Sequence, residues 1–280
     1  YRITTNKKGI PVTIFDREDP GSMSSYGNAG HFSPYAVVQL NRPDVIYDIP
    51  KMLLSSYGPL ALKWNYVPKL IPWIFNYLKN FNKNSMLHTA KYMHQILSLS
   101  NDAYEDIFKE IDTTNLIEKK GIIYVWTNKN LKSRELEIKV RHDLGIEQKL
   151  LTQKEILDLE PNLNPAFDAG VIYEKAMHAK DPHGILKEIF KLFIKKGGKF
   201  IQENITNLKQ ISNNQTIINS EQEEYTFEKT VIASGAFSKN LTDQLEENIP
   251  LDTERGYHVH FKDMEHLISR PVIFLDRGFG

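Results

Sequence analysis

The 280-residue sequence contains no cysteine, no excess of either charge and no long apolar run. The absence of cysteine excludes disulfides, thiolate metal sites and cysteine nucleophiles from these residues, and it fits a reducing compartment. The 35 basic residues balance 35 acidic ones, so no net field favours nucleic acid or an acidic membrane. The lysines are scattered rather than clustered, which argues against a nucleic-acid groove. Since no run of about 18 apolar residues occurs, no stretch is predicted to span a bilayer.

The remaining composition is that of a globular protein, with 41% hydrophobic and 25% charged residues. The length suffices for one large or two ordinary domains. The sequence begins at Tyr1, without a methionine and inside a helix-like run, and ends in "FLDRGFG", where a strand leads into further residues. We therefore expect a fragment that lacks both ends.

Strand-like and helix-like segments alternate in the outer parts of the chain, around a more helical middle at residues 50–112. Within that middle, residues 84–111 are expected to form one long amphipathic helix. Its predicted inner stripe consists of Met86, Tyr92, Met93, Ile96, Leu97, Leu99, Tyr104 and Ile107. A second helix is predicted from Pro182, capped by Asp181 and ended by Gly197 and Gly198. The pattern predicts an α/β nucleotide-binding domain interrupted by a second domain.

Three segments carry candidate chemistry. The strand "VTIF" ends on Asp16, whose carboxylate could accept both hydroxyls of a ribose, although a surface acid at a turn has the same pattern. The loop "SSYGNAG", residues 24–30, offers hydroxyls and small residues that let backbone amides approach a ligand, although composition alone favours a plain turn. The third segment, "TVIASGAFS", is expected to be a buried strand that runs into residues too small to obstruct a cofactor.

In this order and spacing, "VTIFDRE", "SSYGNAGHFSP", "DPHGILKEIFKLFIKKGGKF", "VIASGAFS" and "ERGYHV" resemble one family. It is the D-amino-acid dehydrogenase (small subunit) and glycine oxidase group of FAD-dependent oxidoreductases, and the resemblance runs from about residue 9 to the last residue. It implies an FAD-binding Rossmann-like domain of the glutathione-reductase type with an inserted α+β substrate domain. The family's glycine-rich loop would lie upstream of Tyr1, and a substrate-binding arginine beyond Gly280. We therefore expect these 280 residues alone to bind FAD poorly.

The resemblance also implies domains and residue roles. The FAD-binding domain would comprise residues 1–45 and 176–245, and the substrate domain residues 46–175 and 246–280. Asp16 would bind the adenosine ribose, with Arg17 beside the adenine, and Tyr257, in a strand begun by residues 255–258, would face the substrate. The other cofactor-binding residues are Ser24, Ser25, Asn28, Ala29 and Gly30 at the pyrophosphate and isoalloxazine, Ile205 at the adenine, and Ala233, Ser234 and Gly235 near the ribityl and phosphate groups.

The implied reaction is oxidative deamination of a D-amino acid, in which hydride leaves Cα for flavin N5 and the resulting imine hydrolyses to a 2-oxo acid. Positioning carries much of the rate, and no protein base is obligatory. His31, His178 and His183 are therefore expected to be ordinary polar or capping residues. "HAKDPH" lacks further ligands nearby, so no metal site is expected.

Several alternatives stay open at this point. The substrate could be glycine, sarcosine or another secondary amine on the same scaffold. The electron acceptor could be oxygen, as in an oxidase, or a quinone or the respiratory chain. The protein could also have lost catalysis and act in binding or regulation. "LKWNYVPKLIPWIFNYL", residues 62–78, is expected to be core or a subunit contact in an oligomer, with a membrane-surface contact as the alternative. We expect a cytoplasmic protein, either free or peripheral on the inner face of the plasma membrane.

Overall fold

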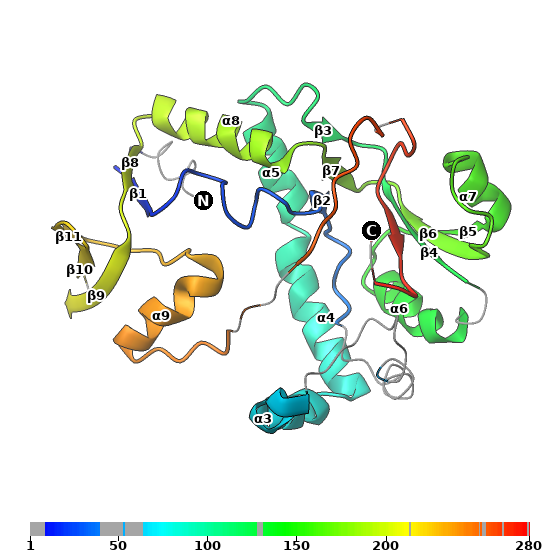
Figure 1. Ribbon diagram of the computed structural model, residues 1–280, viewed down its shortest axis with the longest axis horizontal. Coiled ribbons are helices and arrows are strands. Elements are labelled where there is room, and N and C mark those ends of the chain that lie inside the picture. The colour runs from blue at the N-terminus through cyan, green and yellow to red at the C-terminus, as the bar shows by residue number, and fades with distance from the viewer. Residues whose placement is uncertain are drawn as a thin grey trace. The chain divides into compact units, whose positions relative to one another are not determined.

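The computed structural model of the protein describes residues 9–39, 53, 64–127, 131–212, 214–251, 253, 256–264, 266–278 and 280. The chain divides into two compact units, each built from separated segments (Figure 1). Unit 1 comprises residues 1–28, 110–112 and 182–260, and unit 2 comprises residues 29–109, 113–181 and 261–280. Assigning the cofactor to one unit and the substrate to the other remains a prediction.

Unit 1 combines a parallel strand pair with a small antiparallel sheet. Its elements are β1 (Thr13–Asp16), α8 (Pro182–Lys195), β8 (Lys199–Gln202), β9 (Ile205–Ser212), β10 (Gln215–Ser220), β11 (Glu224–Phe227), the 3-10 helices η4 (Gly235–Phe237) and η5 (Asp243–Leu245), and α9 (Ser238–Thr242). β1 pairs in parallel with β8, and the second sheet has the order β11-β10-β9. The predicted strand ending on Asp16 and the predicted helix from Pro182 are both confirmed.

Aromatic side chains connect the elements of unit 1. Phe190 of α8 meets Phe200 of β8 edge to face, with ring centroids 5.2 Å apart. α8 ends at a glycine with a φ of 83°, as the Gly-Gly pair predicts. The ring of Phe15 in β1 lies 4.9 Å from Tyr225 and 5.8 Å from Phe227, so β11 packs against the parallel pair. The sequence thus places an apolar layer directly behind the strand that ends on Asp16.

Unit 2 contains two sheets. One has four strands in the order β12-β4-β6-β5, and the other has three strands in the order β2-β7-β3. Its strands are β2 (His31–Phe32), β3 (Ile117–Glu118), β4 (Ile122–Trp126), β5 (Lys149–Thr152), β6 (Ala169–Tyr173), β7 (Met177–Ala179) and β12 (Val272–Phe274). Its helices are η2 (Trp64–Tyr66), α3 (Val67–Lys79), α4 (Lys83–Leu97), α5 (Ser100–Phe108), α6 (Leu131–Asp143) and α7 (Gln153–Leu159).

The strand β4 forms the centre of unit 2 because its side chains are buried on both faces of the sheet. Ile122 and Trp126 belong to one core cluster, which includes Tyr35 and Tyr173. The alternate residues Ile123 and Val125 point to the opposite cluster, against α7. This alternation follows from the two-residue period of a strand.

Buried charges in unit 2 are paired. Arg141 of α6 donates to Glu137 at 3.1 Å and, through Nε, to the backbone oxygen of Tyr35 at 3.1 Å. Glu160, which is 2% exposed, accepts hydrogen bonds from the backbone and hydroxyl of Ser269 and from Arg270. These contacts join α6 and the end of α7 to segments far away in the sequence.

The helical middle differs from the prediction in two respects. Residues 84–111 form two helices, α4 and α5, separated by a turn at Ser98 and Leu99, rather than one. Met86 and Leu97 of the predicted stripe do pack inward, together with Ala90. Five members of the predicted stripe are instead exposed by more than a third, namely Tyr92, Met93, Ile96, Leu99 and Tyr104. The expectation that α3 lies in the core is also wrong, since none of its residues is buried.

Among the described residues, no helix has the length and apolar character needed to cross a membrane.

Candidate functional site

The carboxyl end of the β1–β8 pair is the first part of the candidate cofactor site, and it lies in unit 1. Asp16, the last residue of β1, stands opposite Gln202, the last residue of β8. Its side chain is exposed, and one carboxylate oxygen accepts the backbone N–H of Glu18 at 3.2 Å. The described residues supply no partner for the other oxygen, so it is free to accept hydrogen bonds from a ligand. The carboxyl end of parallel strands is where α/β sheets bind nucleotides.

Arg17 connects this edge to the predicted small-residue segment. Its guanidinium lies 4.3 Å from the centre of the Phe237 ring, which ends η4. η4 begins at Gly235, and a Cβ at this glycine would meet nothing within 4 Å. The structure therefore brings Asp16 and Arg17 to the same side of unit 1 as Ser234 and Gly235. Ile205, the half-buried first residue of β9, follows Gln202 by only three positions.

The expected buried strand before Gly235 is not present. Residues 231–234 have no regular structure, Ala233 and Ser234 are exposed, and Val231 is 63% exposed. Valine and isoleucine favour a strand, but a strand also needs a hydrogen-bonded neighbour, and none of the described strands pairs with this segment. The small residues nevertheless leave the space around Gly235 open, which is the property expected of a cofactor-facing turn.

The loop predicted to approach the pyrophosphate is a series of tight turns. The side-chain amide of Asn28 donates to the backbone oxygen of Ser25 at 3.1 Å, while Ser24 is exposed. At Gly27, a Cβ would lie 2.3 Å from the imidazole Cε1 of His258. Because the ring of His258 is exposed and can rotate, this contact does not by itself require glycine at position 27.

Ala29 and Gly30 lie in unit 2, where they lead into β2. Gly30 has a φ of 68°, and its backbone oxygen accepts the N–H of Ala179 at 2.7 Å. A Cβ at Gly30 would lie 2.5 Å from the backbone oxygen of Ala179. The protein backbone itself therefore requires a glycine here.

Tyr257 is placed differently from the expectation. Residues 256–260 belong to unit 1 and form no strand, because none of the described strands pairs with them. Tyr257 is 86% exposed, and Arg255 lies outside the described residues. The expected strand beginning at residues 255–258 is therefore absent from the part that the structure describes, and the substrate role of Tyr257 remains a prediction.

Two residues near the site were missed by sequence reasoning, namely Phe237 under Arg17 and His258 beside Gly27. Both stand within segments quoted for the resemblance, "VIASGAFS" and "ERGYHV", but the sequence does not reveal these contacts, because each residue is distant along the chain from its partner. The three histidines that were expected to be ordinary polar or capping residues contact other residues of the protein. His31 pairs with His178 across β2 and β7. Burial lowers the pKa of both rings, and the charge of His178 lowers the pKa of His31 further. The ring of His183 packs against Tyr26.

The residues of unit 1 fit the adenosine part of FAD. An acid with a free oxygen, an arginine and an unobstructed glycine turn occur together at the carboxyl end of a parallel strand pair. Asp16 would accept from the ribose hydroxyls, and Arg17 and Phe237 would lie near the adenine. No group of three acidic or histidine side chains in the described residues could hold a metal ion.

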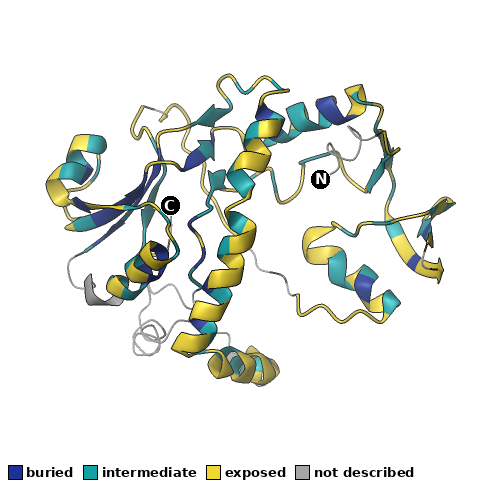
Figure 2. Cartoon of the chain, turned by 180° about the vertical axis from the view of Figure 1, so that it is seen from behind, coloured by how far each residue is buried: buried dark blue, intermediate teal, exposed yellow. Residues whose placement is uncertain are grey.

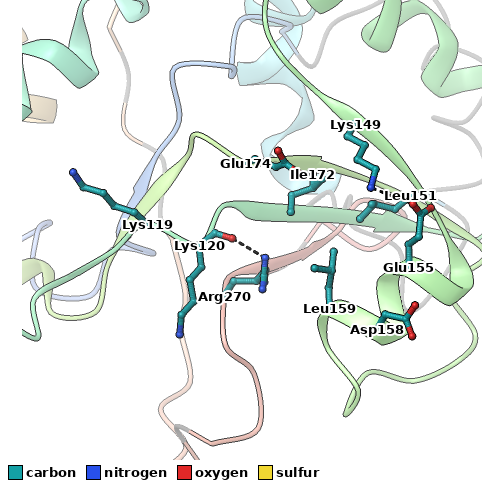
Figure 3. Close-up of a pocket in the computed structure, with 10 residues that line it drawn as sticks. All are labelled: Lys119, Lys120, Lys149, Leu151, Glu155, Asp158, Leu159, Ile172, Glu174 and Arg270. Carbon is teal, nitrogen blue, oxygen red and sulfur yellow. Dashed lines mark hydrogen bonds and ion pairs between the residues drawn. The ribbon is translucent and has the colours of Figure 1, made fainter.

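Unit 2 contains a cavity of about 400 Å³ beside α7 and strands β5 and β6 (Figure 3). Leu151, Leu159 and Ile172 form its apolar lining. Each cation of its rim contacts an acid, and these pairs are Lys119–Glu105, Lys120–Glu118, Lys149–Glu155 and Arg270–Glu160. None of the predicted FAD-binding residues lines the cavity. With its cations already neutralised, it has little attraction for a phosphate group.

Known proteins resemble this chain over most of its length. The family model described as "FAD dependent oxidoreductase" matches residues 3–279. A D-amino-acid oxidase of Bradyrhizobium diazoefficiens is 30% identical over 262 residues, covering 92% of this chain and 62% of that protein. A D-amino acid dehydrogenase of Helicobacter pylori is 24% identical over 263 residues, covering 94% of this chain and 63% of that protein. The chain thus spans less than two thirds of the length of these relatives.

A solved structure of glycine oxidase from Geobacillus kaustophilus superposes with a TM-score of 0.59 at 17% identity, covering 88% of this chain and 54% of that one. At this identity the likeness shows the fold. The predicted fold class, an α/β protein with an FAD-binding Rossmann-like domain, is confirmed.

Proposed function

Because the chain belongs to the FAD dependent oxidoreductase family, we propose that the whole protein oxidatively deaminates D-amino acids. The products would be an imine, which water hydrolyses to a 2-oxo acid and ammonium, and an electron pair that passes to oxygen or a quinone. Bound FAD would supply the hydride acceptor for the Cα–H of the amino acid. The observation that carries the proposal is the 30% identity, over 92% of this chain, to a protein named D-amino-acid oxidase.

The contribution of unit 1 would be to hold the adenosine end of the cofactor. The carboxylate of Asp16 already has one oxygen oriented by the N–H of Glu18, which leaves the second for a ribose hydroxyl. Arg17 is fixed over Phe237, so its guanidinium offers a planar surface at the same edge. These contacts anchor the cofactor, whereas the amino acid would be selected elsewhere, on the side for which Tyr257 is the candidate.

A second candidate is oxidation of glycine or a secondary amine. The solved glycine oxidase superposes with a TM-score of 0.59, and a solved iminodiacetate oxidase from Chelativorans superposes with 0.54 at 14% identity. Both supports are likenesses of fold, which does not decide the substrate. D-amino acids are favoured because the relatives matched over most of this chain by sequence carry that name.

The first test is spectroscopic. Purified whole protein should show a flavin spectrum that bleaches when D-alanine is added without oxygen, and L-alanine should have no effect. Bleaching by glycine or sarcosine alone would replace the first candidate by the second. A protein that contains no flavin after reconstitution would refute both.

The second test concerns Asp16 itself. Asp16→Asn should weaken FAD binding about tenfold, because hydrogen bonds to a charged acceptor are worth about 1.5–3 kcal/mol and those to a neutral one roughly half. FMN, which has no adenosine, should bind the variant and the parent equally. Glu18→Gln is the matched control, since it removes an exposed acid two residues away while leaving the Glu18 backbone N–H in place. Equal FAD affinity for parent and Asp16→Asn would remove Asp16 from the site.

A further inference from the structure

A long stretch of the chain carries only positive charge. Residues 49–101 contain six lysines and neither aspartate nor glutamate, so all 35 acids lie in the other 227 residues. The overall charge balance conceals this asymmetry. Helices α3 and α4 of unit 2 occupy most of the described part of the stretch.

Helix α3 has one half-buried face and one exposed apolar face. Val67, Leu70, Ile74 and Tyr77, spaced three and four residues apart, are half-buried and form the inner face. The adjacent outer stripe is Ile71, Phe75 and Leu78, exposed by 46%, 71% and 44%, and Trp73 is exposed by 55%. We call Ile71, Phe75 and Leu78 the α3 patch. Trp73 lies on another side of the helix, where its ring stacks on that of Tyr77.

The same arrangement continues on α4. Met86 and Ala90 are buried, whereas Tyr92 and Ile96, four residues apart, are exposed by 51% and 69%. Figure 2 shows α3 and much of α4 in the colour of exposed residues. Hence two consecutive helices present apolar side chains that the described part of unit 2 does not cover.

We propose that the α3 patch binds the surface of an anionic lipid bilayer, with the exposed side chains of α4 beside it. Phenylalanine and leucine are suited to the boundary between headgroups and acyl chains. Lys79, one turn after Phe75, and Lys83, the first residue of α4, are exposed near the α3 patch, and residues 49–101 contain no acid that would oppose their attraction to anionic headgroups. This inference does not depend on the proposed redox reaction.

A second copy of the chain is a less suitable occupant. In a two-fold symmetric contact the same surface meets itself, so the lysines of one copy would face the lysines of the other, and residues 49–101 supply no acid to pair with them. An anionic bilayer complements the same charges. The charge pattern therefore distinguishes two occupants that the apolar stripe alone would not.

Vesicle sedimentation tests the proposal. Purified protein should sediment with vesicles of phosphatidylcholine and phosphatidylglycerol, should bind less in high salt, and should bind phosphatidylcholine vesicles poorly. Phe75→Ser should weaken the partition at least tenfold, since burying such a side chain is worth roughly 1.5–3 kcal/mol. Ile211→Ser, at an exposed apolar residue of β9, is the matched control and should not change it.

The lysines give an independent test should Phe75→Ser be poorly folded. Lys79→Gln with Lys83→Gln should weaken binding to anionic vesicles by about fivefold per lysine, whereas Lys209→Gln on β9 should have no effect. Failure of the parent protein to bind anionic vesicles, or equal binding by parent and both variants, would overturn the proposal. So would a concentration-dependent dimer that Phe75→Ser abolishes, because a second copy would then occupy the patch.

Discussion

Gly30→Ala should destabilise unit 2 much more than the same change at another glycine with a similar backbone conformation. Gly30 and Gly145 have φ values of 68° and 74°, so alanine is strained at both. At Gly145, a Cβ would meet nothing within 4 Å. At Gly30, it would lie 2.5 Å from the backbone oxygen of Ala179 and 3.1 Å from the Ala179 Cβ. The pair of variants therefore separates backbone strain from steric overlap.

The magnitude follows from what must move. A positive φ costs an L-residue roughly 1–2 kcal/mol, and the stiffer unfolded chain returns roughly 0.4–1 kcal/mol, so Gly145→Ala should cost about 0.5–1 kcal/mol. At Gly30 the atom that obstructs the added Cβ is the backbone oxygen of Ala179, which cannot rotate away as a side chain could. Ala179 is held by its N–H bond to Gly30 and by its pairing with Ile117, so relief of the overlap must disturb β2, β7 and β3 together. With overpacking worth roughly 1–3 kcal/mol, Gly30→Ala should cost about 2–4 kcal/mol in total.

Urea unfolding followed by tryptophan fluorescence measures this difference. All three tryptophans, Trp64, Trp73 and Trp126, belong to unit 2, so the signal reports that unit alone. Equal shifts of the unfolding midpoint for Gly30→Ala and Gly145→Ala would refute the steric argument. A Gly30→Ala variant of normal stability that had lost FAD binding would instead support a direct cofactor role for this glycine.

Three further predictions concern unit 2 and use the same fluorescence assay. Glu160→Ala should cost about 3–5 kcal/mol, because it leaves Arg270 partly buried without its acid; a loss below about 1 kcal/mol would contradict this. Thr152→Ala removes the capping box of α7 and should cost about 1 kcal/mol. Burial lowers the pKa of both His31 and His178, and the charge of His178 lowers the pKa of His31 further. The unfolded chain then binds more protons below pH 6.5, so stability should fall as the pH drops below that value, and His31→Gln should flatten the dependence.

The sequence predicted those features that local chemistry decides. The apolar run that ends on Asp16 became β1, and α8 begins at Pro182 and ends just before the paired Gly197 and Gly198, as predicted. Features that need a distant partner were not predictable. Helical spacing showed that Tyr92 and Ile96 share a face of α4, but not that this face is left uncovered. Similarly, the β-branched residues before Gly235 favour a strand, yet only a neighbouring strand could have supplied its hydrogen bonds.

The candidate site shows why one pattern can carry two explanations. The loop of residues 24–30 was assigned to a cofactor because its glycines permit close approach, and close approach is what the structure shows. At Gly27 the approaching group is the ring of His258, and at Gly30 it is the backbone of Ala179. The backbone of Ala179 therefore suffices to require Gly30, whereas the exposed ring of His258 can turn away from a Cβ at Gly27, so packing does not by itself require that glycine. Asp16 has no such internal explanation: its carboxylate is exposed, it has one unused oxygen, and no packing contact requires an acid there. For this reason Asp16, rather than the glycines, is the residue on which the cofactor assignment depends, and the FAD affinity of Asp16→Asn is its most direct test.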